Sequence, residues 1–225
     1  CTTSETSGGG VWLSAGLLTH SVVTNNHAWG CAGVALTDTA RMENCLVADN
    51  WNFYRNGVYY SYGIVYVRRV TSGTVPTVRN CTIVSNRTYE SGALWVQEPN
   101  GGPLFQPIVE NSIIWDNTDY TTGAVMNWHT SSSKYTSDEM TSNMVANCTW
   151  PTAGISGAKN IDSDPLFSAK APYYLSFASP CRGAGDNTSV TSTTDLDGNP
   201  RRYGRKVDMG CYELQGGAGL MMLVR

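Results

Sequence analysis

The stretch Asn80-Cys81-Thr82-Ile83-Val84-Ser85-Asn86 recurs along this chain with few changes. Its near copies are Ser21-Val22-Val23-Thr24-Asn25-Asn26, Asn44-Cys45-Leu46-Val47-Ala48-Asp49-Asn50 and Asn111-Ser112-Ile113-Ile114-Trp115-Asp116-Asn117, and Asn147-Cys148-Thr149-Trp150 keeps only the opening. Self-similarity at a period of roughly 20–50 residues is typical of solenoids and related arrays. The sequence therefore predicts a stack of repeated units.

A second landmark, a glycine followed by apolar residues, precedes each copy. The glycines are Gly10, Gly33, Gly63, Gly92 and Gly123, at intervals of 23, 30, 29 and 31 residues. Fixed landmarks at variable spacing indicate loops of different size inserted into one recurring unit. Because side chains alternate along a strand, we expect the first and third residues after each glycine to face a common core.

The parity of the apolar positions predicts a corner inside each repeat. Apolar residues lie three positions before the Cys or Ser, at Met42, Val78, Val109 and Val145. Three is odd, so a straight strand would place the two positions on opposite faces. We therefore expect a bend at the intervening asparagine, a residue that tolerates left-handed backbone angles and can stack in amide ladders. The predicted corner residues are Asn44, Asn80, Asn111 and Asn147, and Cys45, Cys81 and Cys148 are predicted as packed core thiols.

Three short strands per repeat, with no helical period, predict an all-β parallel β-helix. A β-sandwich with coincidental internal similarity is the alternative. Residues 1–150 are expected to form the coils, and residues 151–225, where the repeat stops, to cap the last coil. Because residues 1–7 run directly into a repeat without a cap, we expect further coils, or another domain, to precede them in the native protein.

Composition narrows the classes of partner. The chain has 15 basic and 18 acidic residues, a net charge of −3, which argues against a nucleic-acid partner. Charged residues make up only 15% of its 225 residues, and Gly, Ser, Thr and Asn are abundant, as suits a β-rich extracellular protein. No apolar run approaches the roughly 18 residues of a membrane-spanning helix, so no transmembrane segment is predicted.

The second half of the chain carries an ordered set of short motifs. They are Asn111–Asn117, Asp164–Phe167, Tyr173–Leu175, Ser179–Cys181, Asp195–Arg201 and Asp208–Glu213. In this order they resemble the C-terminal region of bacterial pectin-lyase-like right-handed β-helix proteins of the choice-of-anchor Q domain type, over residues 8–213. The resemblance implies a right-handed helix and a secreted or cell-surface protein, but no defined reaction. We do not expect residues 214–225 to form the sorting anchor usual after the Tyr-Glu motif, because this stretch is too short.

Two sites follow from the C-terminal motifs. Cys181 and Cys211 stand where the family pattern more often has Ala, which favours a disulfide between them over two independent free thiols. Asp195, Asp197 and Asn199 have the spacing of a calcium loop, although the downstream Glu is missing. A turn with capping carboxylates, paired with Arg201 or Arg202, is the favoured alternative. Apart from this possible calcium ion, no cofactor is predicted.

An aromatic cluster is the strongest hint of ligand binding. Six aromatic residues fall within one insertion of the repeat: Trp51, Phe53, Tyr54, Tyr59, Tyr60 and Tyr62. Such a loop can stack sugar rings or form a protein interface, and so predicts a polysaccharide or another surface protein as partner. The alternative is that the loop folds over the outer face of the coils.

Candidates for catalysis are sparse, and no catalytic residue is predicted. Lyases and glycosidases on this fold need several converging charged groups. The charged candidates are Arg68, Arg69, Glu98, Asp138 and Glu139, and the histidines at 20, 27 and 129 are scattered. We therefore expect a structural, adhesive or glycan-contacting protein. A polysaccharide lyase or glycoside hydrolase is one alternative, and a filament subunit that self-associates through its N-terminal coil is another.

Overall fold

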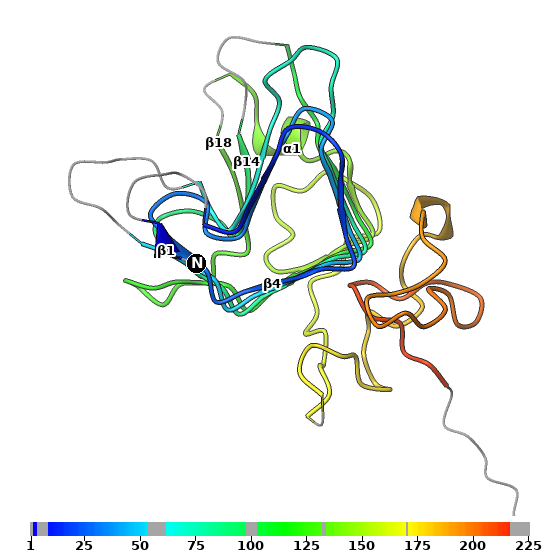
Figure 1. Ribbon diagram of the computed structural model, residues 1–225. Coiled ribbons are helices and arrows are strands. Elements are labelled where there is room, and N and C mark those ends of the chain that lie inside the picture. The colour runs from blue at the N-terminus through cyan, green and yellow to red at the C-terminus, as the bar shows by residue number, and fades with distance from the viewer. Residues whose placement is uncertain are drawn as a thin grey trace, which may run out of the picture.

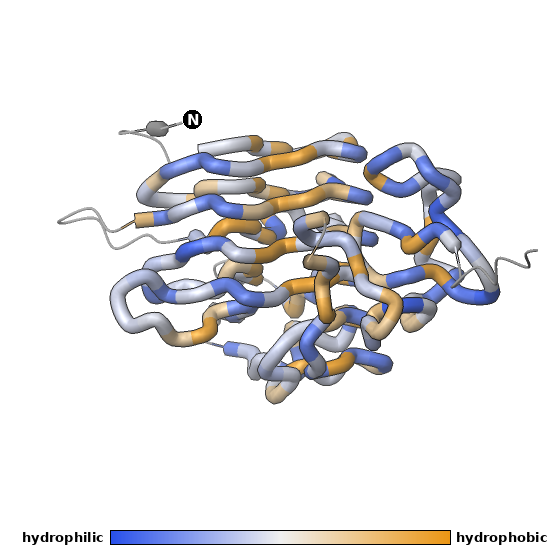
Figure 2. The backbone as a smooth tube through the Cα atoms, turned by 90° about the horizontal axis from the view of Figure 1, so that it is seen from below, coloured by the Kyte–Doolittle hydropathy of each residue, from blue (hydrophilic) through white to orange (hydrophobic). Residues whose placement is uncertain are grey.

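The structure, a computed structural model, describes residues 2–3, 9–53, 62–97, 103–131, 134–169 and 171–216. It confirms the right-handed parallel β-helix with three strands per coil, which enclose a triangular body (Figure 1). A fourth strand of two residues, not expected from the sequence, follows the third in the first four coils. Figure 2 shows the coils as stacked parallel rungs with their hydrophobic stretches above one another.

Every named strand belongs to one of four five-stranded parallel sheets. The first sheet contains β2 (Val11–Leu13), β6 (Val34–Thr37), β10 (Val65–Arg68), β14 (Leu94–Gln97) and β18 (Trp128–Ser131). The second contains β3 (Leu17–Thr19), β7 (Arg41–Glu43), β11 (Thr77–Arg79), β15 (Ile108–Glu110) and β19 (Met144–Val145). The third contains β4 (Val22–Thr24), β8 (Leu46–Ala48), β12 (Thr82–Val84), β16 (Ile113–Trp115) and β20 (Cys148–Thr149). The fourth contains β1 (Thr2–Thr3), β5 (His27–Ala28), β9 (Trp51–Asn52), β13 (Arg87–Thr88) and β17 (Thr118–Asp119).

The predicted corner between the second and third sheets is confirmed in three coils. Asn44, Asn80 and Asn111 have φ angles of 50°, 50° and 52°, the left-handed region that Asn tolerates. The next residue, Cys or Ser, donates a hydrogen bond back across the corner to the carbonyl two positions earlier. These bonds are Ser21 to Thr19 (2.8 Å), Cys45 to Glu43 (3.2 Å), Cys81 to Arg79 (3.0 Å) and Ser112 to Glu110 (2.9 Å). The position therefore selects a small donor, which explains why Cys and Ser alternate there.

The fifth coil is displaced by one residue from the predicted alignment. Ile113 pairs with Cys148, so Asn147 is level with Ser112 and the left-handed corner falls on Ala146, with φ of 56°. Met144, not Val145, fills the core place, and Cys148 packs on the outer side of the third sheet. A one-residue slip moves each side chain to the opposite face. The predictions for Asn147 as corner and Cys148 as core thiol of the coil interior are therefore wrong.

The glycine landmark holds for two coils and then slips. Gly33 lies against the next coil, where a Cβ would meet the Ile64 carbonyl oxygen at 2.7 Å. Val65 pairs with Val34, so Ile64, and not Gly63, is level with Gly33. Tyr66 and Trp95 consequently leave the core, which Val65, Val67, Leu94 and Val96 fill instead. The expected inward orientation of Tyr66 and Trp95 is corrected for this reason.

The continuous asparagine ladder lies at a different corner from the one predicted. It follows the third sheet and consists of Asn26, Asn50, Asn86, Asn117 and Asn127. Each side-chain amide donates to the next side-chain oxygen, at 2.9, 3.0, 2.8 and 2.9 Å along the row. At the predicted corner one such bond links Asn111 to Asn80, at 3.2 Å, and the Asn44 amide has no partner. The ladder satisfies buried amides that would otherwise destabilise the stack.

Residues 162–216, the C-terminal segment, lie along the side of the stack and not on its end (Figure 1). Apolar residues of this segment, such as Leu175, Met209 and Tyr212, pack on the outer face of the third sheet. Hydrogen bonds reach several coils, from Thr191 to Glu43 and from the Cys211 amide to Thr82. The expected cap is thus a lateral cover. A short helix α1 (Ser137–Met140) and residues 151–161 adjoin the last coil instead, with Met140 buried in the core.

The C-terminal segment contains one 3-10 turn, η1 (Asn187–Ser189). In the parts of the chain that the structure describes, no helix is long and apolar enough to cross a membrane.

Candidate functional site

A groove of 230 Å³ opens where the fourth sheet turns away from the third. Its walls come from three successive coils, and the lining residues are His27, Asp49, Asn50, Trp51, Ser85 and Arg87. Because equivalent residues of successive coils lie one strand spacing apart, about 4.8 Å, the groove follows the axis of the stack. Such a groove suits an elongated ligand.

Two rows of side chains form the groove. In the fourth sheet His27 pairs with Trp51, Trp51 with Arg87 and Arg87 with Thr118, so these side chains share one face. The second row is a left-handed corner at Asn25, Asp49, Ser85 and Asp116, with φ of 56°, 54°, 54° and 52°. The corner residues precede the ladder asparagines, which hold the backbone at this position. Two exposed carboxylates therefore lie two coils apart beside the row that contains Trp51.

Trp51 is the centre of an aromatic cluster. Its ring meets the His27 ring edge-on at 5.3 Å and the Tyr120 ring at 5.5 Å, and Phe53 lies 6.4 Å away. Tyr120 in turn contacts Tyr89 at 5.7 Å. Edge-to-face contacts of this kind fix ring orientation. Trp51 is held by these neighbours while its side chain still lines the groove.

Tyr173 of the C-terminal segment adjoins the corner row from the other side. Its hydroxyl donates to an Asp49 carboxylate oxygen at 3.0 Å. Burial, and then the bond to Asp49, raise the pKa of Tyr173, so the phenol stays protonated at neutral pH. The Ser85 hydroxyl donates to Asp116 at 3.3 Å. The C-terminal segment thus supplies a hydrogen bond that orients the carboxylate of Asp49.

The predicted aromatic residues divide between two surfaces. Trp51 lines the groove and Phe53 contacts its ring, whereas the Tyr62 ring lies tilted against Tyr66, at 4.9 Å, on the outer face of the first sheet. Tyr54, Tyr59 and Tyr60 lie outside the described residues. The sequence did not point to Asp49, Asp116 or Arg87 as site residues. Asp49 and Asp116 each directly precede a repeated Asn, which was a visible signal, but this spacing is equally typical of turns.

The outer face of the first sheet carries a second aromatic row. Trp12, Ala35, Tyr66, Trp95 and His129 are in register across its five strands. Tyr66 is nearly buried beneath Tyr62, and its hydroxyl hydrogen-bonds Gln97. Trp95 meets the His129 ring at 5.4 Å. This row lacks carboxylates, so it offers stacking surface without the acidic groups of the groove.

The geometry at Asp195 matches the predicted capping turn. One carboxylate oxygen accepts the backbone N–H groups of Asp197 and Asn199, at 3.0 and 2.9 Å, and the other accepts that of Glu213, at 2.9 Å. The Asp197 carboxylate accepts from the Tyr174 hydroxyl at 2.5 Å. Within the described ranges, no group of three or more His, Cys, Asp or Glu side chains is arranged to hold a metal ion. Calcium binding at Asp195, Asp197 and Asn199 stays a prediction.

The expected disulfide is not formed. Cys181 and Cys211 are free and buried, and they lie in different apolar clusters. Cys181 instead adjoins Cys148, because the slip in the fifth coil turns Cys148 outward toward the C-terminal segment. A hydrogen bond between these two thiols, followed by burial, raises the pKa of Cys148. Burial also raises the pKa of Cys31 and of Cys211 to about 12, so both are unreactive thiols.

The charged candidates from the sequence do not converge. Asp138 and Glu139 belong to the first turn of α1, where Glu139 completes a capping box with Thr136. Arg69 donates to the Pro103 carbonyl and lies over the Phe105 ring, 5.6 Å from its centroid. Glu98 lies outside the described residues.

Comparison of the chain with protein-family models, with curated proteins and with solved structures returned no match.

Proposed function

We propose that this protein is a secreted or cell-surface β-helix that binds a linear glycan along the groove at Trp51. The observation that carries the proposal is the position of Trp51. Its side chain lines a groove that crosses three coils, between His27 and Arg87 of its own row and beside Asp49, Asn50 and Ser85 of the adjacent corner. Aromatic rings stack on sugars, and the adjacent polar groups match sugar hydroxyls.

The repetition of the groove supports a polymer as ligand. Asp49, Ser85 and Asp116 occupy one corner in successive coils, so similar acceptors recur at the coil spacing. A ligand built of repeating units can meet such a series, whereas a single small molecule would use one coil only. The motif resemblance to choice-of-anchor Q proteins of the pectin-lyase-like type is part of this proposal, and it supports the extracellular location.

The test is a glycan array followed by titration calorimetry of the best ligand. Trp51→Ala should weaken binding by at least about tenfold, because the stacking face is lost. Trp150→Ala removes an exposed tryptophan at the end of the third sheet and should bind like the parent protein. Trp12→Ala removes an exposed ring of the second aromatic row and, as a further control, should also bind like the parent protein. If no glycan is retained, or if Trp51→Ala binds with unchanged affinity, the groove is not a glycan site.

Hydrolysis of the bound glycan is a second candidate function. Asp49 and Asp116 are two coil spacings apart, roughly 9–10 Å, near the upper end of the separation of about 6.5–9.5 Å in inverting glycosidases. Release of reducing ends by the wild-type protein, abolished in both Asp49→Asn and Asp116→Asn, would support this activity. Asp162→Asn, at an exposed carboxylate elsewhere, is the control.

Self-association through the first coil stays a prediction, and sedimentation over a range of concentrations tests it.

A further inference from the structure

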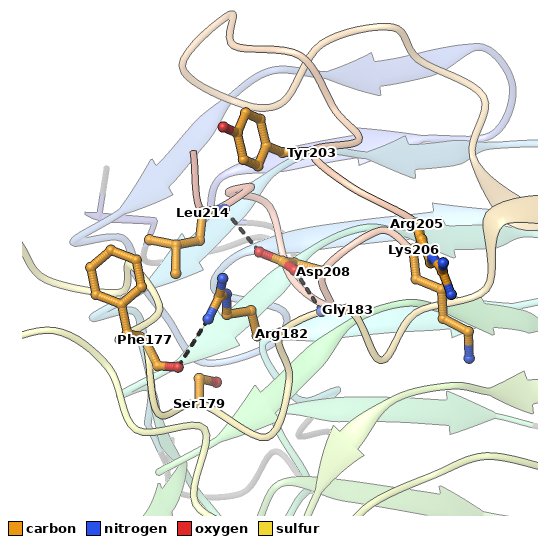
Figure 3. A pocket seen from close by; sticks show the side chains of 9 residues that line it. All are labelled: Phe177, Ser179, Arg182, Gly183, Tyr203, Arg205, Lys206, Asp208 and Leu214. Carbon is orange, nitrogen blue, oxygen red and sulfur yellow. Dashed lines mark hydrogen bonds between the residues drawn. The ribbon is translucent and has the colours of Figure 1, made fainter. Parts of the chain in front are cut away.

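A larger pocket, of 490 Å³, lies within the C-terminal segment, away from the coils that form the groove. Two stretches of this segment, residues 177–183 and 203–208, face each other across it, and Leu214 closes one side (Figure 3). Neither the repeat nor the aromatic insertion contributes a side chain to this pocket. It is therefore a separate site from the groove at Trp51.

The lining is strongly basic for a chain with a net charge of −3. Arg182, Arg205 and Lys206 line the pocket, and all three are exposed. Within the described part of the chain, none of the three has a carboxylate within ion-pair distance. Arg182 lies beside Asp208 and Phe177, whereas Arg205 and Lys206 lie together apart from it (Figure 3), so the positive charge is spread along the pocket and creates a field that attracts anions.

The single carboxylate of the pocket, Asp208, interacts electrostatically with Arg182 but forms no ion pair with any of the three cations. Asp208 is buried, and its two oxygens accept the backbone N–H groups of Gly183, at 2.6 Å, and Leu214, at 2.8 Å (Figure 3). The bond from Gly183 joins the two stretches that face each other across the pocket, and the bond from Leu214 ties the closing side to the second stretch. Asp208 is thus a structural brace that fixes the distance between the stretches, and the basic side chains are left for a ligand.

Two exposed aromatic rings border the basic groups. Phe177 and Tyr203 are 55% and 53% exposed, unusually high values for large rings with apolar surface. The Arg182 guanidinium lies over the Phe177 ring, 5.3 Å from its centroid, and donates to the Phe177 carbonyl at 3.2 Å. Arg182 is thereby held at the pocket wall in one orientation. A small inorganic anion would gain nothing from the two rings, whereas a sugar ring would stack on them.

We propose that this pocket binds a saccharide that carries an anionic group, either a carboxylate or a sulfate. Arg182 receives the anionic group through its planar fork of donors, which matches either oxyanion bidentately. Arg205 and Lys206 supply additional positive charge, and Phe177 and Tyr203 contact the apolar face of the sugar ring. A nucleic acid is disfavoured, because the overall negative charge opposes a long phosphate backbone beyond the pocket.

The inference stands without the glycan groove, since the two sites share no residue. Titration calorimetry should use a uronate oligosaccharide, a sulfated oligosaccharide and the methyl-esterified uronate oligosaccharide, which has the same backbone without charge. We expect binding of at least one anionic ligand and no binding of the ester. Arg182→Gln should weaken it by about tenfold, the usual effect of one charge-assisted hydrogen bond. The double variant Arg205→Gln/Lys206→Gln should also weaken binding and reduce its dependence on salt.

Matched variants separate this site from the groove and from general charge effects. Arg41→Gln removes a partly exposed arginine of the second sheet and should leave the affinity unchanged. Trp51→Ala should likewise leave anionic binding intact, even if the groove proposal fails. Thermal unfolding checks that each variant folds. The proposal is overturned if neither anionic saccharide binds, if Arg182→Gln binds like the parent, or if a single-stranded DNA oligonucleotide of equal charge binds as tightly.

Discussion

At the scale of single residues, side-chain hydrogen bonds at the corners hold the coils in place. Cys or Ser at the first corner bonds the carbonyl two residues back, and Asn at the second corner bonds both its own coil and its neighbours. A corner interrupts the backbone pairing of the strands, so its buried amides and carbonyls need side-chain partners. The repeated letters of the sequence are therefore positions of hydrogen bonding as well as of packing.

Asn86 provides the most direct test of the ladder. Its amide donates to Asn117, at 2.8 Å, and to the carbonyls of Val47 and Val84, at 3.0 Å each. Asn86→Ala would leave these buried acceptors without a donor, so we expect the free energy of unfolding to fall by at least about 2 kcal/mol. Urea denaturation monitored by circular dichroism measures the change. Asn143→Ala, at an exposed asparagine, should stay within about 0.5 kcal/mol of the parent.

The sequence showed which residue types repeat but could not assign the ladder to one corner. Asn44 and Asn50 are equally regular in the repeat. Only the structure shows that Asn50 points along the stack, while Asn80 and Asn111 face the C-terminal segment, with hydrogen bonds to Arg201 and Asp186. Both corners need left-handed residues, so composition alone does not distinguish them.

At the scale of elements, strand register and the position of the C-terminal segment decide which side chains are exposed. One-residue slips at Gly63 and at Asn147 put Tyr66 and Cys148 on outer faces. The segment then covers Cys148 with Cys181 and Met209, and leaves the groove at Trp51 open. The groove and the basic pocket both depend on this segment, since Tyr173 adjoins one and residues 177–214 form the other.

Arg201 anchors the segment to the third coil. The guanidinium is 1% exposed, and its Nη2 donates to the carbonyls of Asp208, at 2.9 Å, and Gly210, at 2.8 Å, and to the Asn80 side chain, at 3.3 Å. Arg201→Met keeps the bulk but leaves buried carboxylates without their cation. We expect a loss of about 3 kcal/mol in the free energy of unfolding.

Arg202→Met, at the exposed neighbouring position, is the matched control and should be nearly neutral. Limited proteolysis adds a local readout, since Arg201→Met should expose residues 162–216 to cleavage before the coils. Equal stability of the two variants would show that the segment is held by its apolar contacts alone.

At the scale of the whole molecule, the interface between stack and segment contains a buried ionic cluster. Arg201 lies 4.0 Å from the Glu213 carboxylate and also interacts electrostatically with the buried carboxylates of Asp195 and Asp208. Burial raises the pKa of Glu213 from 4.5 to about 7, and raises that of Asp208 as well. The pKa of Asp119, in the fourth sheet, shifts in the opposite direction. At Asp119 burial alone would raise the pKa, but hydrogen bonds from Thr121, Thr122 and Glu90 lower it.

The cluster predicts a fall in stability from pH 5 to pH 8. A folded-state pKa above the unfolded value means that Glu213 contributes fully below pH 4.5, and that this contribution is lost as the pH rises through about 7. The loss should reach up to about 3 kcal/mol, measured by urea denaturation at both pH values. Glu213→Gln should flatten this dependence, although it costs a backbone hydrogen bond. A parent protein of equal stability at pH 5 and pH 8 would contradict the assignment.

The sequence by itself determined the parallel β-helix, the corner at Asn44, Asn80 and Asn111, and most of the core. A repeated pattern acts locally: each copy needs only its own alternation and its own corner residue, and identical copies stack. It also indicated an aromatic site that includes Trp51. Only the tertiary structure decided the register slips, the ladder corner, the lateral place of the C-terminal segment and the two sites beside it. These depend on contacts between distant, non-repeating residues, such as Tyr173 with Asp49 and Arg201 with Asn80, which no local spacing encodes.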